Sequence, residues 1–102
     1  MEEIDWERLG HVRRSKNRQK ILGILQESRP PLTPKDISER MERDIRNVSK
    51  AILQLLDKEL VECVTPEAKK TRMYKITKDG KHIFEMVQDI EKQQEKYRKD
   101  KQ

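Results

Sequence analysis

Two amphipathic segments with almost no chain between them constrain the fold most strongly. The first begins at Thr33, whose hydroxyl can cap a helix, and continues through a proline to Asp36 in the place of a capping box. Ile37 and Met41 follow one turn apart and predict an inward face. The residues "ERD" interrupt this pattern, and the last of them, Asp44, can cap a second helix. Two helices joined by so short a turn predict a helix-turn-helix motif.

The second of these helices, predicted over residues 45–58, has a divided surface. At about 100° per residue, its large aliphatic side chains gather on one side. The other side is polar, and Asp57 is the only acid on it. Such a face either lies in water or reads DNA, where Arg and Lys match guanine while Asn and Gln match adenine. The aliphatic side consists of Ile45, Val48, Ile52, Leu55 and Leu56, flanked by Ala51 and Leu53; the polar side consists of Arg46, Asn47, Lys50, Gln54, Asp57 and Lys58.

The chain before the motif is predicted to form two further helices. A short helix over residues 2–9 is expected to stop at Gly10, within an N-terminal arm over residues 1–14. In the basic run that follows, Ser15 can cap a helix that ends before Pro30. The cations of this run either touch DNA backbone or lie in water. The apolar residues of the arm are Ile4, Trp6, Leu9 and Val12, and the cations are Arg13, Arg14, Lys16, Arg18 and Lys20.

The chain after the motif changes from a period near 3.6 residues to a period near 2. The runs "LVECVT" and "TRMYKIT" predict a two-stranded hairpin, and its loop over residues 66–72 carries Lys69, Lys70 and Arg72. Thr77 can cap a last helix over residues 77–99, although Gly80 weakens its first turn by about 1 kcal/mol relative to alanine. Residues 100–102 are expected to fray.

The last helix also carries the spacing of a short coiled coil. Apolar or amide residues recur at intervals of four, three, four and three, which favours a helix that pairs with a second copy of the chain over one that lies free in water. Ile83 and Phe84 can instead complete the domain core. Ile4, Trp6 and Leu9 of the arm are candidates to join the pairing interface. The seam consists of Ile83, Val87, Ile90, Gln94 and Tyr97.

Composition excludes several classes of protein. The 102 residues carry 24 Lys and Arg against 19 Asp and Glu, a net charge of +5 that favours an anionic partner. The single cysteine, Cys63, and two isolated histidines predict no disulfide, no metal site and no cofactor. No apolar run suggests a membrane span and no nucleophile stands beside a base, so a cytoplasmic protein that is not an enzyme is expected.

The order of elements carries a resemblance to a known family. "LTPKDISERMERDIRNVSKAILQLLDKELVECVTPEAKKTRMYKITKDGKHIF" resembles the winged helix-turn-helix of small prokaryotic transcription regulators related to the MarR and ArsR groups. The likeness covers about residues 15–84. It implies a mostly α, α+β fold, in which a three-helix core carries a two-stranded β-hairpin wing and is followed by an extended C-terminal helix. The turn "ERD" lacks the glycine common in such motifs.

The resemblance also assigns roles by position. Ile37, Met41, Ile45 and Val48 fall where the family packs its two motif helices, and Ser38 falls where a small residue lets them approach. The family's recognition helix corresponds to residues 45–58. Candidate contacts to bases or phosphates are Arg46, Asn47, Ser49, Lys50 and Gln54, and candidate contacts of the wing are Lys69, Lys70 and Arg72.

These patterns together predict a homodimeric, sequence-specific regulator that binds double-stranded DNA. The recognition helix would enter the major groove, and the wing loop would lie on the backbone or in the minor groove. Two alternatives stay open. The chain is otherwise a non-specific architectural DNA-binding protein, or a winged-helix module that docks on a protein and binds no DNA.

Overall fold

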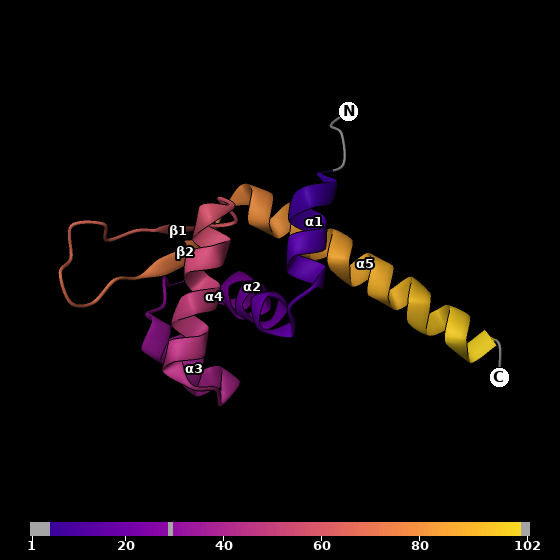
Figure 1. Ribbon diagram of the computed structural model, residues 1–102, viewed down its shortest axis with the longest axis horizontal. Helices are drawn as coiled ribbons and strands as arrows, with labels where there is room; N and C mark the ends of the chain where they lie inside the picture. Colours follow the sequence, from indigo (N-terminus) through magenta and orange to yellow (C-terminus); the bar gives the residue numbers. More distant parts are fainter. Residues whose placement is uncertain (1–4, 29, 101–102) are drawn as a thin grey trace.

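The described residues of the computed structural model form five helices and a two-stranded antiparallel sheet (Figure 1). The structure describes the backbone of residues 5–28 and 30–100, and the side chains of residues 5–28 and 30–96. The predicted order of helices and strands is confirmed. The elements are α1 (Trp6–Arg13), α2 (Lys16–Glu27), α3 (Pro34–Met41), α4 (Ile45–Asp57), β1 (Val61–Cys63), β2 (Tyr74–Ile76) and α5 (Lys78–Asp100).

Three predicted caps begin α2 and the two helices of the motif, α3 and α4. The hydroxyl of Ser15 accepts from the backbone amide of Arg18 at the start of α2. Thr33 and Asp36 form a reciprocal capping box at the start of α3. The carboxylate of Asp44 accepts from the first turn of α4. Each cap satisfies an amide that the helix itself leaves unpaired, so these boundaries follow from local chemistry.

The turn between α3 and α4 closes without glycine. Glu42 adopts the left-handed conformation at φ 54°, while its amide donates to Glu39 and the next amide, of Arg43, donates to Ser38. The same pair of backbone bonds ends α4, with Glu59 at φ 59°. This is the Schellman arrangement, in which the left-handed position is usually glycine. Two glutamates therefore hold conformations that cost a side chain free energy.

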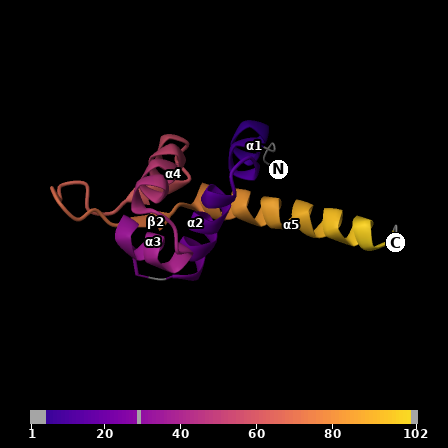
Figure 2. The ribbon, with the colours of Figure 1, turned by 60° about the horizontal axis from the view of Figure 1, so that its bottom comes forward.

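The hairpin is shorter in regular structure than its sequence pattern predicted. Val61 pairs with Ile76, and Cys63 pairs with Tyr74. Leu32 adds an isolated bridge to the other edge of Tyr74, which ties the segment before α3 to the sheet. The loop beyond the strands projects from one end of the molecule, and the C-terminal half of α5 projects from the other (Figures 1 and 2).

The core confirms most of the predicted inward face of the motif and corrects three positions, one of which is Leu53, expected at a flank but exposed on the opposite side of α4. Val48, Ala51, Ile52 and Leu55 of α4 are buried. Ile45, expected to pack between the motif helices, is 45% exposed, because it occupies the first helical position, on the solvent side of the turn. Ala51, expected at a flank, is buried. Helices α1, α2, α3 and α5 supply further core residues: Leu9, Val12, Ile21, Leu22, Leu25, Ile37, Met41, Ile83 and Val87.

The N-terminal helix differs from its prediction. It begins at Trp6 and runs through Gly10 to Arg13, so the predicted stop at Gly10 is wrong. Leu9 and Val12 are buried against α2 and α5, and this packing stabilises the helix across the glycine. Residues 1–4, including Ile4, lie outside the described residues.

The last helix begins directly after Thr77, as predicted, and the packing of its first turn explains why residue 80 is a glycine. The amide of Gly80 donates to the hydroxyl of Thr77, and a Cβ on Gly80 would lie 2.1 Å from the carbonyl oxygen of Leu60. The glycine therefore lets the first turn of α5 lie directly on the backbone that leads into β1. Residues 101 and 102 of the predicted frayed tail lie outside the described residues.

The predicted seam of α5 divides between the core and the surface. Ile83 and Val87 are buried within a single chain, so these two positions are not available to a partner helix. The heptad spacing predicted correctly that these positions are buried. It could not distinguish burial within one chain from burial against a second copy. Ile90 is partly buried and Gln94 is exposed, whereas the side chain of Tyr97 lies outside the described residues. None of the described helices has the length and apolar character needed to cross a lipid bilayer.

Candidate nucleic-acid interface

The outward surface of α4 is a single row of side chains. At about 100° per residue, Arg46, Lys50, Leu53 and Asp57 lie within about 60° of one another and opposite the buried residues of the helix. All four are exposed, and the side chain of Arg46 is 89% exposed. We call these four residues the outward row. It reads cation, cation, leucine and carboxylate from the N-terminal to the C-terminal end.

Arg46 is held at the base of this row by the helix cap. Its backbone amide donates to Asp44 over 2.7 Å, and its Nε and one terminal nitrogen lie 3.4 Å from the same carboxylate. The backbone bond and the guanidinium lower the pKa of Asp44 below its ordinary value. Asp44 thus stays ionised and orients Arg46, while the other donors of the guanidinium remain open to an acceptor.

Three more predicted contact residues lie around the first turns of α4. Asn47 and Lys50 are exposed, and Ser49 is half-buried beside the core. Asn47 and Ser49 lie on opposite sides of the outward row, each about a quarter-turn from its centre. The structure thus brings Arg46, Asn47 and Lys50 together as an exposed set of donors and one amide, with Ser49 at the edge.

Gln54 is engaged within the protein. Its Oε1 accepts from both Nε and Nη2 of Arg18 at 3.1 and 2.9 Å, and Nη1 of Arg18 donates to the carbonyl of His11 at 2.6 Å. Bidentate pairing with adenine needs both ends of an amide. Gln54 can therefore read adenine in this way only after it releases Arg18. The spacing of the sequence gave no signal of this link, which joins α1, α2 and α4.

The wing places the predicted cations on a projecting loop. Lys69, Lys70 and Arg72 are all exposed. Thr65 braces the loop, because its hydroxyl accepts from the amide of Met73 and its carbonyl accepts from Ala68. Nε of Arg72 donates to the carbonyl of Ala68, which leaves the rest of its guanidinium outward. The loop projects from the half of the molecule that contains α4 (Figure 1).

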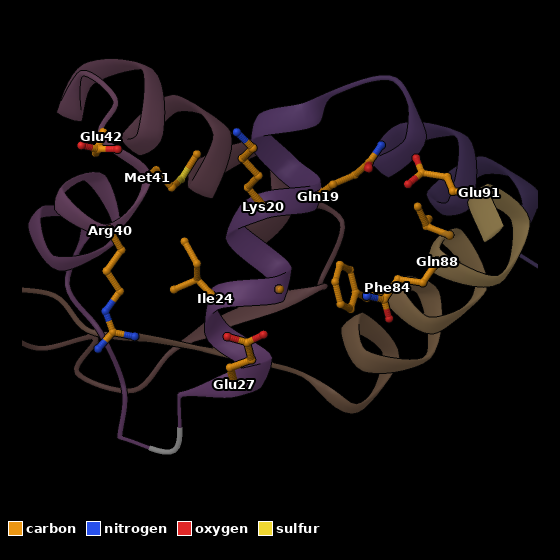
Figure 3. Close-up of a pocket in the computed structure, with 12 residues that line it drawn as sticks. Gln19, Lys20, Ile24, Glu27, Arg40, Met41, Glu42, Phe84, Gln88 and Glu91 are labelled. Atoms are coloured by element: carbon orange, nitrogen blue, oxygen red, sulfur yellow. The ribbon is translucent and has the colours of Figure 1, made fainter. Parts of the chain in front are cut away.

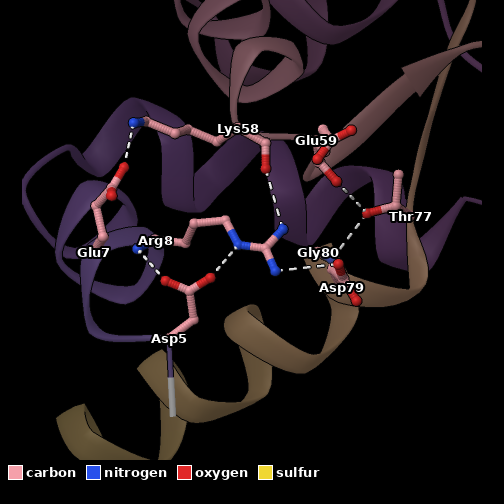
Figure 4. Close-up of polar contacts among 8 residues, drawn as sticks. All are labelled: Asp5, Glu7, Arg8, Lys58, Glu59, Thr77, Asp79 and Gly80. Carbon is pink, nitrogen blue, oxygen red and sulfur yellow. Dashed lines mark hydrogen bonds and ion pairs between the residues drawn. The ribbon is translucent and has the colours of Figure 1, made fainter. Parts of the chain in front are cut away.

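A polar cluster at the C-terminal end of α4 was not predicted from the sequence (Figure 4). Arg8 donates to Asp5 at 2.6 Å, to the carbonyl of Lys58 at 3.1 Å and to Asp79 at 3.1 Å. Nζ of Lys58 pairs with Glu7. These bonds raise the pKa of Arg8 and of Lys58. The cluster fastens the C-terminal end of α4 to α1 and to the first turn of α5.

His11 lies beside this cluster with an unsatisfied ring nitrogen. Its Nε2 is buried and has no hydrogen-bond partner among the described residues. Burial lowers the pKa of His11, and the positive charges of Arg18, Lys58 and Arg14 lower it further. The imidazole is therefore held neutral where α1 meets the rest of the chain.

A cavity of about 560 Å³ opens between α2, the end of α3 and α5, away from the outward row (Figure 3). Ile24, Met41 and Phe84 supply apolar wall, and the charged side chains around them are of both signs. Lys20, one of the cations expected either to touch DNA backbone or to lie in water, lines it, whereas the predicted contact residues of α4 and of the wing do not. In the described part of the chain, no group of three or more His, Cys, Asp or Glu side chains is placed to hold a metal ion.

Comparison with known proteins identifies the fold. The sequence matches no protein-family model and none of the curated proteins. Among solved structures, a point mutant of MepR from S. aureus is similar with a TM-score of 0.76 and 20% identity, over 94% of this chain and 72% of that chain. A MepR-DNA complex from S. aureus is similar with a TM-score of 0.69 and 18% identity, over 95% and 84%.

A MarR/EmrR family transcriptional regulator from Acinetobacter gives a TM-score of 0.64 and 24% identity, over 81% of this chain and 58% of that chain. The predicted winged-helix fold, with a mostly helical core and a two-stranded wing, is thus confirmed. The predicted likeness to winged-helix regulators of the MarR group is confirmed at the level of the fold.

Proposed function

We propose that this protein is a homodimeric, cytoplasmic transcription regulator that binds double-stranded DNA in a sequence-specific way and performs no catalysis. The observation that carries the proposal is the exposed set Arg46, Asn47 and Lys50 on the first turns of α4, beside a projecting basic wing. The same fold occurs in a MepR-DNA complex, which supports the proposal by analogy.

The contacts would divide between base edges and backbone. The first turns of α4 enter the major groove, where Arg46 and Lys50 donate to guanine and Asn47 pairs with adenine. Ser49 at the groove edge suits a phosphate. Lys69, Lys70 and Arg72 of the wing lie on the flanking backbone or minor groove, and they contribute affinity without sequence preference. Gln54 contributes to DNA binding indirectly, through the hydrogen bond that its side-chain oxygen accepts from Arg18.

Two copies would pair through the side chains of α1 and α5 that a single protomer leaves exposed. Trp6 is 69% exposed, and Ile90 is the last seam residue that is partly buried. Gln94 and Tyr97 continue the spacing beyond it. An isolated tryptophan at this exposure favours an interface, because burying its ring removes a large apolar area from water. A two-fold dimer then predicts inverted half-sites about 10 base pairs apart, or a multiple of that.

Selection of binding sites from a random duplex library tests the proposal. An inverted repeat recovered with the full chain supports the regulator. Tight binding without any enriched motif supports the architectural alternative, and absence of binding at physiological salt supports the protein-docking alternative. A paired variant, Arg46→Ala with Asn47→Ala, is the control: it should lose the motif while it keeps salt-dependent binding through the wing.

A further inference from the structure

Leu53 stands in the outward row of α4, where the remaining members are charged. Its side chain is 59% exposed and lies on the side of α4 opposite the buried residues. Its neighbours along the row are Lys50, one turn before it, and Asp57, one turn after it. Leu53 was expected at the flank of the buried face, and this expectation is wrong: at about 100° per residue Leu53 lies opposite that face, and the structure leaves it exposed.

The position of Leu53 along α4 determines which part of the DNA lies next to its side chain when α4 lies in a groove. It follows Lys50 by about 4.5 Å and Arg46 by about 10.5 Å along the helix axis, at 1.5 Å per residue. Stacked bases are about 3.4 Å apart, so the base nearest to Leu53 is one or two pairs from that of Lys50. Leu53 shares the outward face of α4 with the two cations, so it is turned toward the DNA when that face lies in a groove.

The chemistry of the groove offers Leu53 one favourable partner. A leucine against phosphate would strip water from the anion and return no hydrogen bond. The edges of the bases in the major groove present donors and acceptors, and the 5-methyl group of thymine is the apolar group among them. Contact between the leucine side chain and this methyl buries apolar area of both partners.

We propose that Leu53 reads the 5-methyl group of one thymine in each half-site, next to the bases contacted by Lys50. This inference rests on the proposed function, because it needs α4 in a major groove. It adds a specificity residue to the donors named above and predicts a thymine at a fixed distance from a guanine in the selected motif. The other surface an exposed leucine could serve, a protein partner, is an outcome of the test.

Replacement of thymine by deoxyuridine removes the methyl group and nothing else, so it tests the contact directly. The full chain is titrated against the selected duplex and against duplexes with uracil at one thymine of each half-site. At one position, the wild type should lose about fourfold in affinity per half-site, the value for burying one methyl-sized group. Leu53→Ala should bind the thymine duplex more weakly and lose little more on the uracil duplex.

Ile45→Ala is the matched control. Ile45 is also an exposed aliphatic residue of α4, but it lies about 80° around the helix from Leu53. This variant should keep the full response to uracil at the same position. Unfolding of each variant, followed by circular dichroism, confirms that any loss of binding occurs in a folded protein.

Three results would overturn the assignment, and they separate it from the proposed function. If Leu53→Ala weakens all duplexes alike, Leu53 touches sugar or backbone. If it leaves every duplex unchanged while the motif persists, Leu53 lies outside the DNA contact, which leaves a protein partner. If the library yields no motif at all, the proposed function fails, and this inference fails with it.

Discussion

Arg8 donates a hydrogen bond from Nη1 to the carbonyl oxygen of Lys58 over 3.1 Å, and so joins α1 to the C-terminal end of α4. A helix leaves its last carbonyls without partners and carries partial negative charge there, so a guanidinium is well matched to this place. The same side chain reaches Asp79 at the start of α5. Three helices distant in sequence meet at one cation.

Substitution of Arg8 by glutamine should therefore destabilise the fold. We expect a loss of about 1–2 kcal/mol in the free energy of unfolding, because the carbonyl of Lys58 and two carboxylates lose a charged donor. Urea unfolding followed by circular dichroism measures the change. Arg13→Gln is the control, because Arg13 is exposed at the end of α1, and it should stay within about 0.5 kcal/mol of the wild type. Equal effects of the two substitutions would show that the cluster contributes nothing.

Glu42 offers a route to a more stable protein. Its left-handed conformation at φ 54° costs a residue with a Cβ, so Glu42→Gly should raise the free energy of unfolding by about 1 kcal/mol. Glu39→Gly is the control within the same turn of chain: Glu39 is an exposed residue of α3, and glycine there should cost about 1 kcal/mol. Thermal melts compare the two. A destabilised Glu42→Gly variant would contradict the strain assigned to this turn.

Burial of His11 makes stability depend on pH in a defined window. Its pKa is lowered in the folded state, so the unfolded chain takes up a proton first as the pH falls below about 6.5. The folded state should lose stability from there down to its own lowered pKa, by at most about 1.4 kcal/mol per pH unit. Unfolding free energies between pH 7.5 and 5.5 give the slope. His11→Gln should flatten it and His82→Gln, at an exposed position, should not; an unchanged slope in His11→Gln would assign the effect elsewhere.

Trp6 provides a native probe of dimerisation. It is the only tryptophan of the chain and is 69% exposed in the protomer. If α1 and α5 form the interface, its fluorescence should shift to shorter wavelength as the concentration rises from nanomolar to micromolar, in step with sedimentation. Ile90→Glu should weaken pairing, whereas Glu85→Gln, on the exposed side of α5, should not. A monomer at micromolar concentration would remove the paired half-sites from the account.

Local chemistry made much of this fold readable from the sequence. The caps at Ser15, Thr33 and Asp44 were predicted because each rests on a hydrogen bond within three residues. The stop at Gly10 was predicted wrongly, because packing of α1 on α5 outweighs the propensity of one residue. The heptad spacing predicted correctly that Ile83 and Val87 are buried. The pattern of one chain does not show whether the same chain or a second copy covers these side chains.

The candidate interface could also be predicted in part from the sequence. Arg46, Asn47 and Lys50 were predicted as exposed because helical periodicity separates the faces of a helix. The commitment of Gln54 to Arg18 and the bond from Arg8 to Lys58 span 36 and 50 residues, and no spacing rule reports such contacts. Leu53 was wrongly placed at the flank of the buried face: at about 100° per residue it lies opposite the buried residues of α4, and it is 59% exposed.

We propose that the first turns of α4 read sequence while the wing supplies general affinity. The most direct measurement titrates the wild type, Arg46→Ala and Lys70→Ala against the selected duplex and a scrambled duplex at two salt concentrations. The wild type should prefer the selected duplex by about 10³ or more. Arg46→Ala should lose about 1–3 kcal/mol on that duplex alone, and Lys70→Ala should weaken both duplexes equally and reduce the salt slope by about one. Equal affinity of the wild type for both duplexes, or identical behaviour of the two variants, would contradict the account.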